Sequence, residues 1–457
     1  MTNPAPSHKE MPSLKKLAIR ATIWTITGHG ASQLLRLGAN LILTRLLFPE
    51  LFGLVSLVNV FIAGLNLFSD IGIGPSIIQN KHGDEPAFYN TAWTLQAVRG
   101  CLIWLGCILI AWPISTFYGE PRLLWLLPLV GIDAFISGFN STALHTLNRD
   151  LEVRQLTLYD LSGQFLCLAI MIVWAWLNPS IWALIVGNTA SALIQMFRSH
   201  RLSPKISNRF TWDKEALASL SSFGRWIFIS TAITFLAEQS DRLILGKLIS
   251  FEMLGVYGVA LTFSDIPRQI ALLISGRVLF PVFSKLAGLP RAELRTKIIR
   301  NRKFILLIMA SGLAIMVCFG DLLISTLYDR RYQEAAWMLP ILTLGIWPRV
   351  LCNTNEPALF AIGKPQYPAI AQFFRFIFTS IGLIVGYHFY GLLGAVIAVS
   401  LNDLCHYAVI NYGLYQEGLS GLLQDAQATL ILFFVMLSVL AIRSALGFGF
   451  PIDALLY

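Results

Sequence analysis

Runs of about 20 apolar residues recur along the whole 457-residue chain, and they limit its fold more than any other feature. A helix of about 20 residues crosses the roughly 30 Å hydrocarbon core of a bilayer and satisfies its own backbone polar groups there. Only 13% of the residues are charged, whereas soluble domains have about 25%. The strands of a membrane barrel are shorter, at about 10 residues. The sequence therefore predicts an all-α polytopic membrane protein.

The apolar runs divide the chain into thirteen candidate transmembrane spans. The final stretch, FGFPIDALLY, is too short for a clear further crossing, so one or two helices after the twelfth span both stay open. The predicted spans are residues 20–47, 51–73, 92–117, 123–147, 155–177, 180–200, 222–249, 253–276, 303–327, 334–358, 366–389, 391–414 and 425–446.

Lysine and arginine residues gather in loops that lie on one side of the predicted membrane. These loops precede the first span and follow the fourth, sixth and eighth spans, and the positive-inside rule assigns them and the N-terminus to the cytoplasm. This asymmetry explains the net charge of +9, so we expect no nucleic-acid partner. The N-terminal apolar run is too long for a signal peptide, and we expect it to be retained. The main basic residues are Lys9, Lys15, Lys16, Arg20, Arg149, Arg154, Arg198, Arg201, Lys205, Arg209, Lys214, Lys285, Arg291, Arg295, Lys297, Arg300, Arg302 and Lys303.

An internal repeat appears when positions 202 residues apart are compared. The segment LILTRLLFPELFG (41–53) aligns with LILGKLISFEMLG (243–255), so that Gly53 meets Gly255. Six spans separate the copies, so both halves insert in the same orientation, as in the parallel repeats of transporters. The repeat predicts two six-helix bundles around a central cavity. The predicted parts are a cytoplasmic tail (1–19), an N-terminal lobe (20–200), a basic linker with a short interfacial helix (201–221), a C-terminal lobe (222–414) and a C-terminal helix with its tail (415–457).

Polar residues form one stripe along the first predicted span. Their spacing of 3 or 4 residues places them on one face of an α-helix. A rise of about 1.5 Å per residue puts Arg36 about 24 Å from Arg20, so its side chain should face protein or water. A water-filled cavity is the preferred explanation. The stripe consists of Thr22, Thr25, His29, Gln33, Arg36, Asn40 and Thr44.

The seventh predicted span carries a second polar stripe. Arg36 aligns with Glu238 at the repeat offset, so the two halves place opposite charges at equivalent depth. Two interpretations stay open. The charges form a permanent ion pair, which would be costly to break, or they pair in one state and part when substrate enters. The second stripe contains Thr231, Thr234, Glu238 and Asp241, with Arg242 beside it.

Further charged residues lie inside later predicted spans and indicate a polar interior. The guanidinium fork of arginine matches phosphate oxygens, so buried arginines favour an anionic ligand. Pro267 should kink or break the eighth span, and both a gate and a purely structural bend stay open for it. The substrate-binding candidates are His29, Gln33, Arg36, Asn40, Glu238, Asp241, Arg242, Arg268, Arg349 and Arg375; the ion-coupling candidates are Asp70, Asp133, Asp265 and Glu356.

Sequence signatures of enzymes are missing from the chain. It contains no P-loop, HExxH, GxSxG or glycine-rich dinucleotide turn. The six cysteines show no metal-ligand spacing and are interpreted as packing residues. We therefore expect a protein that is not an enzyme and that needs no cofactor or metal. Its energy would come from an ion gradient, the membrane potential or the substrate gradient, with Na⁺ and H⁺ as the candidate coupling ions.

Three segments carry a resemblance to a known family. Residues 41–79, 226–260 and 277–286 (RVLFPVFSKL) resemble bacterial polysaccharide transporters, or oligosaccharide flippases, of the multidrug/oligosaccharidyl-lipid/polysaccharide exporter superfamily. The branch resembled includes colanic-acid and teichuronic-acid exporters. It implies two six-helix lobes around a cationic cavity in the bacterial inner membrane. It also implies that alternating access moves undecaprenyl-pyrophosphate-linked oligosaccharides outward, for lipopolysaccharide or exopolysaccharide assembly machinery.

The resemblance covers the first span only in part. The related lipid II flippases use first-helix arginines, and Arg45 matches one such basic position. Two other arginine positions fall on Gln33 and Ala39, so the role of Arg36 rests on its depth and its stripe.

Two other functions stay open beside the flippase. A cation-coupled multidrug-type exporter of the same superfamily would have a smaller and more acidic cavity. A membrane glycosyltransferase or polymerase acting on the lipid-linked glycan would need a sizeable outer loop with catalytic residues, and no predicted outer loop is that long.

Overall fold

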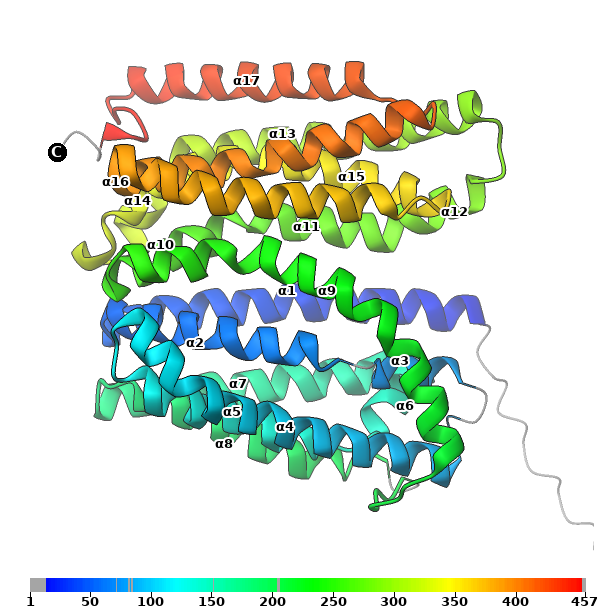
Figure 1. Cartoon of the computed structure of the whole chain (residues 1–457). Coiled ribbons are helices and arrows are strands. Elements are labelled where there is room, and N and C mark those ends of the chain that lie inside the picture. The colour runs from blue at the N-terminus through cyan, green and yellow to red at the C-terminus, as the bar shows by residue number, and fades with distance from the viewer. Residues whose placement is uncertain are drawn as a thin grey trace, which may run out of the picture. The chain divides into compact units, whose positions relative to one another are not determined.

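The structure is a computed structural model that describes residues 14–453, apart from 71, 81–82, 84, 151 and 204–205. Helices form the regular structure of these residues, and no strand occurs among them (Figure 1). Among the residues that the structure describes, eight helices are long and apolar enough to cross a membrane, or up to nine if a bent helix pair counts as one span. This confirms the predicted all-α polytopic fold.

The predicted number of spans is larger than this count for two reasons. Helix α16 (Gln366–Gln416) is one helix of 51 residues whose backbone leaves helical geometry at Tyr390 and Gly391, between two predicted spans. Gly391 has a φ of 58°, a conformation that glycine adopts without a steric penalty. In addition, α1, α8 and α9 lie at predicted positions but are not among the eight helices counted from the described residues. The total of thirteen stays a prediction.

Contacts among the described residues divide the chain into two compact units, whose bounds differ from the predicted lobes. The first unit consists of residues 1–46, 69–112 and 124–227. Within it, α7 packs between α1 and α8, and α5 and α6 are bent against each other by 61°. Its helices are α1 (Leu14–Leu46), α3 (Ile73–Gln79), α4 (Pro86–Tyr118), α5 (Leu123–Gly138), α6 (Ala143–Arg149), α7 (Val153–Leu177) and α8 (Trp182–Ser199).

The second unit consists of residues 47–68, 113–123 and 228–457. It contains α2 and the end of α4, and α9 passes from the first unit into it. Helix α17 lies along α13, and α15 packs on α16 (Figure 1). Its helices are α2 (Pro49–Phe68), α9 (Lys214–Leu248), α10 (Phe251–Ser264), α11 (Ile266–Ile274), a π-helical turn η1 (Ser275–Leu279), α12 (Phe280–Leu286), α13 (Arg291–Leu327), a 3₁₀ turn η2 (Arg330–Tyr332), α14 (Ala335–Gly345), α15 (Trp347–Ala361), α16 and α17 (Leu422–Ala445).

Two local predictions can be compared directly with the helix boundaries. Pro267 does break the eighth predicted span, because α10 ends at Ser264 and α11 begins at Ile266 with this proline in its first turn. The short interfacial helix predicted within 211–223 is wrong as a separate element. Its residues from Lys214 onward open the 35-residue helix α9, which no proline interrupts.

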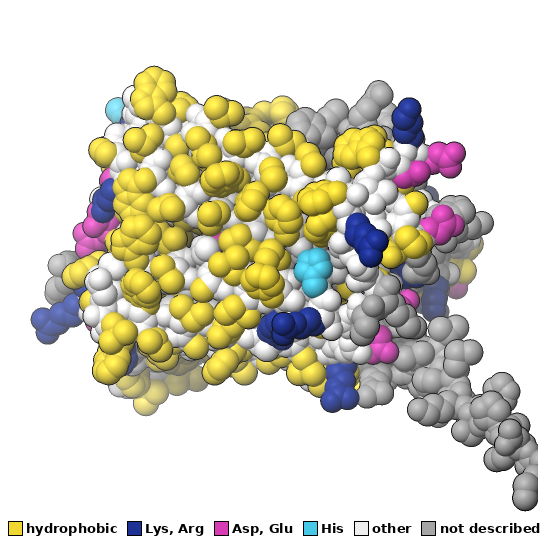
Figure 2. Space-filling model, turned by 90° about the horizontal axis from the view of Figure 1, so that it is seen from below, with side chains coloured by type: hydrophobic (Ala, Val, Ile, Leu, Met, Phe, Trp, Pro, Cys, Tyr) yellow, Lys and Arg dark blue, Asp and Glu magenta, His cyan; other side chains and the backbone are white. Residues whose placement is uncertain are grey.

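Large apolar side chains cover much of the surface. Figure 2 shows one face on which hydrophobic side chains form an almost continuous layer, with most charged side chains toward two of its edges. Exposed residues of this kind include Trp112, Trp176 and Phe434, which lie on three different helices. Apolar surface of this extent is suited to contact with lipid rather than water.

The two sequence repeats meet at equivalent glycines where α2 and α10 begin. A Cβ atom on Gly53 would lie 1.9 Å from the carbonyl oxygen of Phe251, and one on Gly255 would lie 2.0 Å from that of Pro49. Pro49 and Phe251 are themselves 202 residues apart, so the contact is symmetric under the repeat. Glycine at both positions allows the two backbones to approach this closely.

We expect Gly53→Ala and Gly255→Ala to destabilise the protein by similar amounts, about 1–3 kcal/mol, because each added methyl group meets a backbone carbonyl. Gly258 on the same helix α10 is a matched control, since a Cβ there has no heavy atom within 4 Å. The measurement is the Tm of the detergent-solubilised protein. Equal Tm values for Gly53→Ala and Gly258→Ala would contradict the close contact.

Helix α17 is held to the second unit by a buried ion pair that the sequence did not predict. Arg302 was assigned to a cytoplasmic loop, but α13 already begins at Arg291 and the Arg302 side chain is 0% exposed. Its Nη2 donates to Asp425 Oδ1 at 2.7 Å, and its Nε donates to Thr354 Oγ1 at 3.1 Å. Asn355 and Tyr407 donate to the other Asp425 oxygen, so both carboxylate oxygens have partners.

Replacing one member of this pair should destabilise the folded protein much more than replacing both members. Arg302→Leu leaves Asp425 buried without its counter-charge, and we expect a loss of about 3–5 kcal/mol. The double variant with Asp425→Leu should recover part of that loss in thermal unfolding experiments. Lys303→Leu changes the exposed neighbouring residue and should have little effect. A double variant less stable than Arg302→Leu would disprove this account.

Candidate functional site

The polar stripe of α1 changes from exposed to buried along the helix. His29 and Arg36 are exposed, and Gln33 and Asn40 are half-buried. Thr44 is 1% exposed and its hydroxyl donates to the carbonyl oxygen of Asn40 at 2.8 Å. The side chain of Thr22 lies outside the described residues. Arg36 and Glu238 belong to different units, so their predicted pairing stays a prediction.

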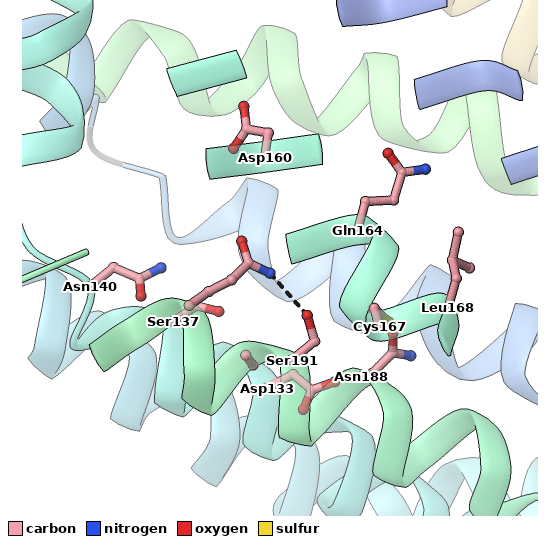
Figure 3. Close-up of a pocket in the computed structure, with 11 residues that line it drawn as sticks. Asp133, Ser137, Asn140, Asp160, Gln164, Cys167, Leu168, Asn188 and Ser191 are labelled. Carbon is pink, nitrogen blue, oxygen red and sulfur yellow. Dashed lines mark hydrogen bonds between the residues drawn. The ribbon is translucent and has the colours of Figure 1, made fainter. Parts of the chain in front are cut away.

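The first unit contains a polar pocket of about 320 Å³ between α5, α7 and α8 (Figure 3). One predicted ion-coupling residue, Asp133, lines it and accepts a hydrogen bond from Thr189 Oγ1 at 2.7 Å. The remaining lining is mostly side-chain amides and hydroxyls, which the sequence analysis did not single out as a site. The lining residues are Asp133, Ser137, Asn140, Asp160, Gln164, Cys167, Leu168, Asn188, Ser191, Ala192 and Gln195.

In the second unit, Arg268 lies between carboxylates from two elements. Its guanidinium forms a close ion pair with Asp265, one turn earlier at the break between α10 and α11. Its Nη1 lies 3.5 Å from Glu238 Oε1 on α9. Gln269 Nε2 also donates to Asp265, at 3.1 Å. The helix break at Pro267 thus presents one arginine to two acidic partners.

Helices α15 and α16 bring two more buried arginines to carboxylates. Arg375 Nε lies 2.9 Å from Asp403 Oδ1, without the alignment of a hydrogen bond. Arg349 Nη1 lies 4.0 Å from Glu356 Oε1 and 3.0 Å from His406 Nε2. The same His406 nitrogen is 2.6 Å from Glu356 Oε1. His406 therefore connects Glu356 and Arg349 through one ring nitrogen.

These groups form one charged cluster. Arg375 also interacts electrostatically with Glu238, Arg268 and Arg349, and Asp403 does so with Arg268 and Arg349. The cluster has four carboxylates and three guanidinium groups. Its carboxylates are those of Glu238, Asp265, Glu356 and Asp403, and its arginines are Arg268, Arg349 and Arg375.

Several buried polar atoms of this cluster have no hydrogen-bond partner within the described part of the chain. They include Arg349 Nε, Arg375 Nη1, Asp403 Oδ1 and His406 Nδ1. Buried polar atoms are normally paired, and leaving one unpaired costs roughly 1–3 kcal/mol. Such atoms indicate a site whose partners change or that takes a ligand.

The remaining predicted residues have local partners. Asp241 Oδ2 accepts from the hydroxyl of Tyr257 at 2.9 Å, and Arg242 Nη1 donates to Gln239 Oε1 at 3.3 Å. Asp70 does not lie in a transmembrane helix, because α2 ends at Phe68. It is exposed, and its Oδ1 accepts from the backbone N–H of Gly72 in the turn before α3.

A group of ion pairs lies where the loop between α4 and α5 meets the start of α2. Arg122 binds the carboxylates of Glu50 and Glu120. Hydrogen bonds from Arg122 hold the pKa of the Glu120 carboxyl below its ordinary value. Glu50 opens α2, so this pair ties the start of α2 to the loop after α4.

One group of side chains has the composition of a metal site. Ligand atoms of Cys352, Glu356 and His406 lie within 4.8 Å of one another. The guanidinium of Arg349 lies against the same His406 nitrogen, and its positive charge opposes a divalent cation there. We therefore interpret these residues as part of the charged cluster.

The sequence analysis missed His406 as a member of the cluster. A signal was present, because Asn402, Asp403 and His406 share one face of an otherwise apolar segment. A lone histidine on such a face gave no reason to expect Glu356 beside it, since the two are 50 residues apart.

Membrane-spanning helices with paired charges and a polar pocket in their interior define a polytopic membrane transporter. The chain belongs to the family described as polysaccharide biosynthesis protein, whose model matches residues 42–337.

Curated relatives are similar at low identity. The succinoglycan biosynthesis transport protein ExoT of Rhizobium meliloti is 22% identical over 76% of this chain and 70% of its own length. The teichuronic acid biosynthesis protein TuaB of Bacillus subtilis is 23% identical over 65% of this chain and 61% of its own length. The lipopolysaccharide biosynthesis protein WzxC of Escherichia coli is 20% identical over 95% of this chain and 88% of its own length.

Solved structures share the fold. The lipid II flippase MurJ in an inward closed conformation has a TM-score of 0.68 at 14% identity, covering 94% of this chain and 99% of that chain. An inward-facing multidrug resistance MATE family transporter of the MOP superfamily has a TM-score of 0.63 at 14% identity, covering 87% of this chain and 95% of that chain. These two structures show the shared fold, and the family model confirms the resemblance to polysaccharide transporters.

Proposed function

We propose that this protein is a flippase that moves undecaprenyl-pyrophosphate-linked oligosaccharide repeat units across the bacterial inner membrane by alternating access, for export of a surface polysaccharide. The observation that carries the proposal is family membership, since the model matches residues 42–337 and relatives are named as polysaccharide transport proteins. The shared fold with a lipid II flippase agrees with it. Polysaccharide assembly machinery would receive the product, and the basic loops would face the cytoplasm.

Arg36 is the preferred residue for the pyrophosphate. The arginines at 268, 349 and 375 already lie beside carboxylates, so an anion would have to displace those partners. Arg36 is exposed, and a guanidinium binds phosphate oxygens in a two-pronged geometry. The stripe residues His29, Gln33 and Asn40 would contact the adjoining polar groups of the substrate.

A cation-coupled multidrug-type exporter is the second candidate. The surplus of carboxylates in the charged cluster favours it, and a MATE family transporter shares the fold. Binding of a lipophilic cation and of a lipid-linked oligosaccharide to the purified protein would separate the two candidates. We further expect no catalysis on the glycan.

We also propose that transport is coupled to Na⁺ or H⁺; at Glu356 and His406 we favour H⁺, because the positive charge of Arg349 opposes a metal cation there. The cluster has one more carboxylate than guanidinium groups, and its members Glu356, Asp403 and Arg375 are largely shielded from solvent, so a cation bound there would balance the charge. His406 Nε2 cannot donate to Glu356 and accept from Arg349 at once, so the protonation state of the histidine selects its partner. Binding and release of one cation would thereby change the contacts between α15 and α16.

Deletion of the gene should cause lipid-linked repeat units to accumulate on the cytoplasmic leaflet. Complementation with Arg36→Ala should fail, because the substrate loses its charge-assisted hydrogen bonds, while Arg36→Lys should restore part of the export. Arg201→Ala, in the loop after α8, is the matched control and should restore export fully. Normal export by a correctly inserted Arg36→Ala protein would rule out the assigned role.

Glu356→Gln should uncouple transport from the ion gradient, because glutamine keeps the shape of the side chain but cannot bind a cation by charge. The measurement is translocation of lipid-linked oligosaccharide in reconstituted vesicles with an imposed H⁺ or Na⁺ gradient. One gradient should accelerate the wild-type protein at least severalfold and leave the variant unaffected. Glu252→Gln, at the exposed start of α10, is the control. A wild-type rate that responds to neither gradient would refute the coupling.

A further inference from the structure

The polar pocket of the first unit differs in chemistry from the charged cluster. None of its eleven lining residues is a lysine or an arginine, and four carry side-chain amides. Figure 3 shows the labelled side chains around one space, and they come from α5 and the residues after it, from α7 and from α8. The amide-bearing residues are Asn140, Gln164, Asn188 and Gln195.

Two of these amides are fixed by neighbouring hydrogen bonds. Gln164 Nε2 donates to the carbonyl oxygen of Ser32 at 3.0 Å, and Gln164 Oε1 accepts from the Ser32 hydroxyl at 2.7 Å. Gln195 Nε2 donates to Ser191 Oγ at 3.1 Å (Figure 3). Side chains held in this way are oriented before any ligand arrives, which reduces the entropic cost of binding.

Other groups in the pocket keep unused hydrogen-bonding capacity. Asn140 Oδ1 is buried and has no partner among the described residues. Asp160 lines the pocket and is exposed. An amide both donates and accepts, and a carboxylate accepts only, so together they match a ligand rich in hydroxyl groups. A bare cation would use only the oxygens and would leave the amide N–H groups unmatched.

The volume of the pocket and the charge of its lining limit the class of ligand further. The volume of about 320 Å³ lies within the range of small-molecule sites, about 300–1,000 Å³, and is far larger than an ion needs. Asp133 and Asp160 repel phosphate and uronate groups, and no lining arginine or lysine compensates for that repulsion. An uncharged sugar ring satisfies both limits.

We infer that this pocket is a subsite for an uncharged sugar ring of the transported glycan, separate from the residues that hold the pyrophosphate. The inference rests on the proposed function. Asn140 follows α5, Gln195 lies in the last turns of α8, and Asp160 lies in the second turn of α7. The predicted orientation assigns these helix ends to the cytoplasmic side, from which the substrate would be loaded.

The test is isothermal titration calorimetry on the purified full-length protein. The probe is the free oligosaccharide, released by mild acid from the lipid-linked unit that accumulates in the deletion strain. Asn140→Leu and Asn188→Leu remove hydrogen-bonding atoms with little change in volume, and each should weaken binding about tenfold. Asn178→Leu, at the exposed end of α7 and outside the pocket, should bind like the wild type. The Tm of each variant verifies that it is folded.

Two competitors identify the ligand class. Inorganic pyrophosphate and sodium chloride should not displace the free oligosaccharide. Displacement by either one, or wild-type affinity in both asparagine variants, overturns the inference while leaving the flippase proposal intact. A deletion strain that accumulates no lipid-linked unit overturns the flippase proposal and this inference together.

Discussion

The organisation of this protein depends on the cost of a polar group inside a membrane. Each buried charge must find a partner within the chain, because lipid offers none. Arg302 and Asp425 meet this requirement, because both carboxylate oxygens accept hydrogen bonds from buried donors. That pair fixes α17 against α13 and α15 and has no spare capacity for a ligand. It is a structural ion pair.

The charged cluster at Glu356 and His406 meets the same requirement only in part. Its arginines lie beside carboxylates, but several N–H groups and oxygens stay unmatched, and one carboxylate is in surplus. A fully satisfied network is rigid, whereas unmatched buried groups are costly and favour a ligand or a change of partner. This difference separates the parts of the second unit that hold the fold from those suited to transport.

The two repeats explain a different feature, the close approach of α2 and α10. The aligned segments 41–53 and 243–255 showed that Gly53 and Gly255 are equivalent, but not that they touch. In the structure each glycine meets the carbonyl oxygen of the residue that begins the other helix. The contact is symmetric under the internal repeat, because the same small residue is needed on both sides of it.

The sequence by itself determined the helical membrane fold, the break at Pro267, the division of α16 and the presence of charges inside spans, because each depends on local hydropathy or local backbone geometry. It did not determine which charges meet. Asp70 looked intramembrane and lies in a turn, and Arg302 looked like a loop residue and is fully buried. His406 meets Glu356, and Asn140 joins Gln195 around one pocket, only through tertiary packing. Hydropathy is read along a single helix, whereas a partner or a pocket exists only when several helices have packed, and that is why only the tertiary structure decided the sites.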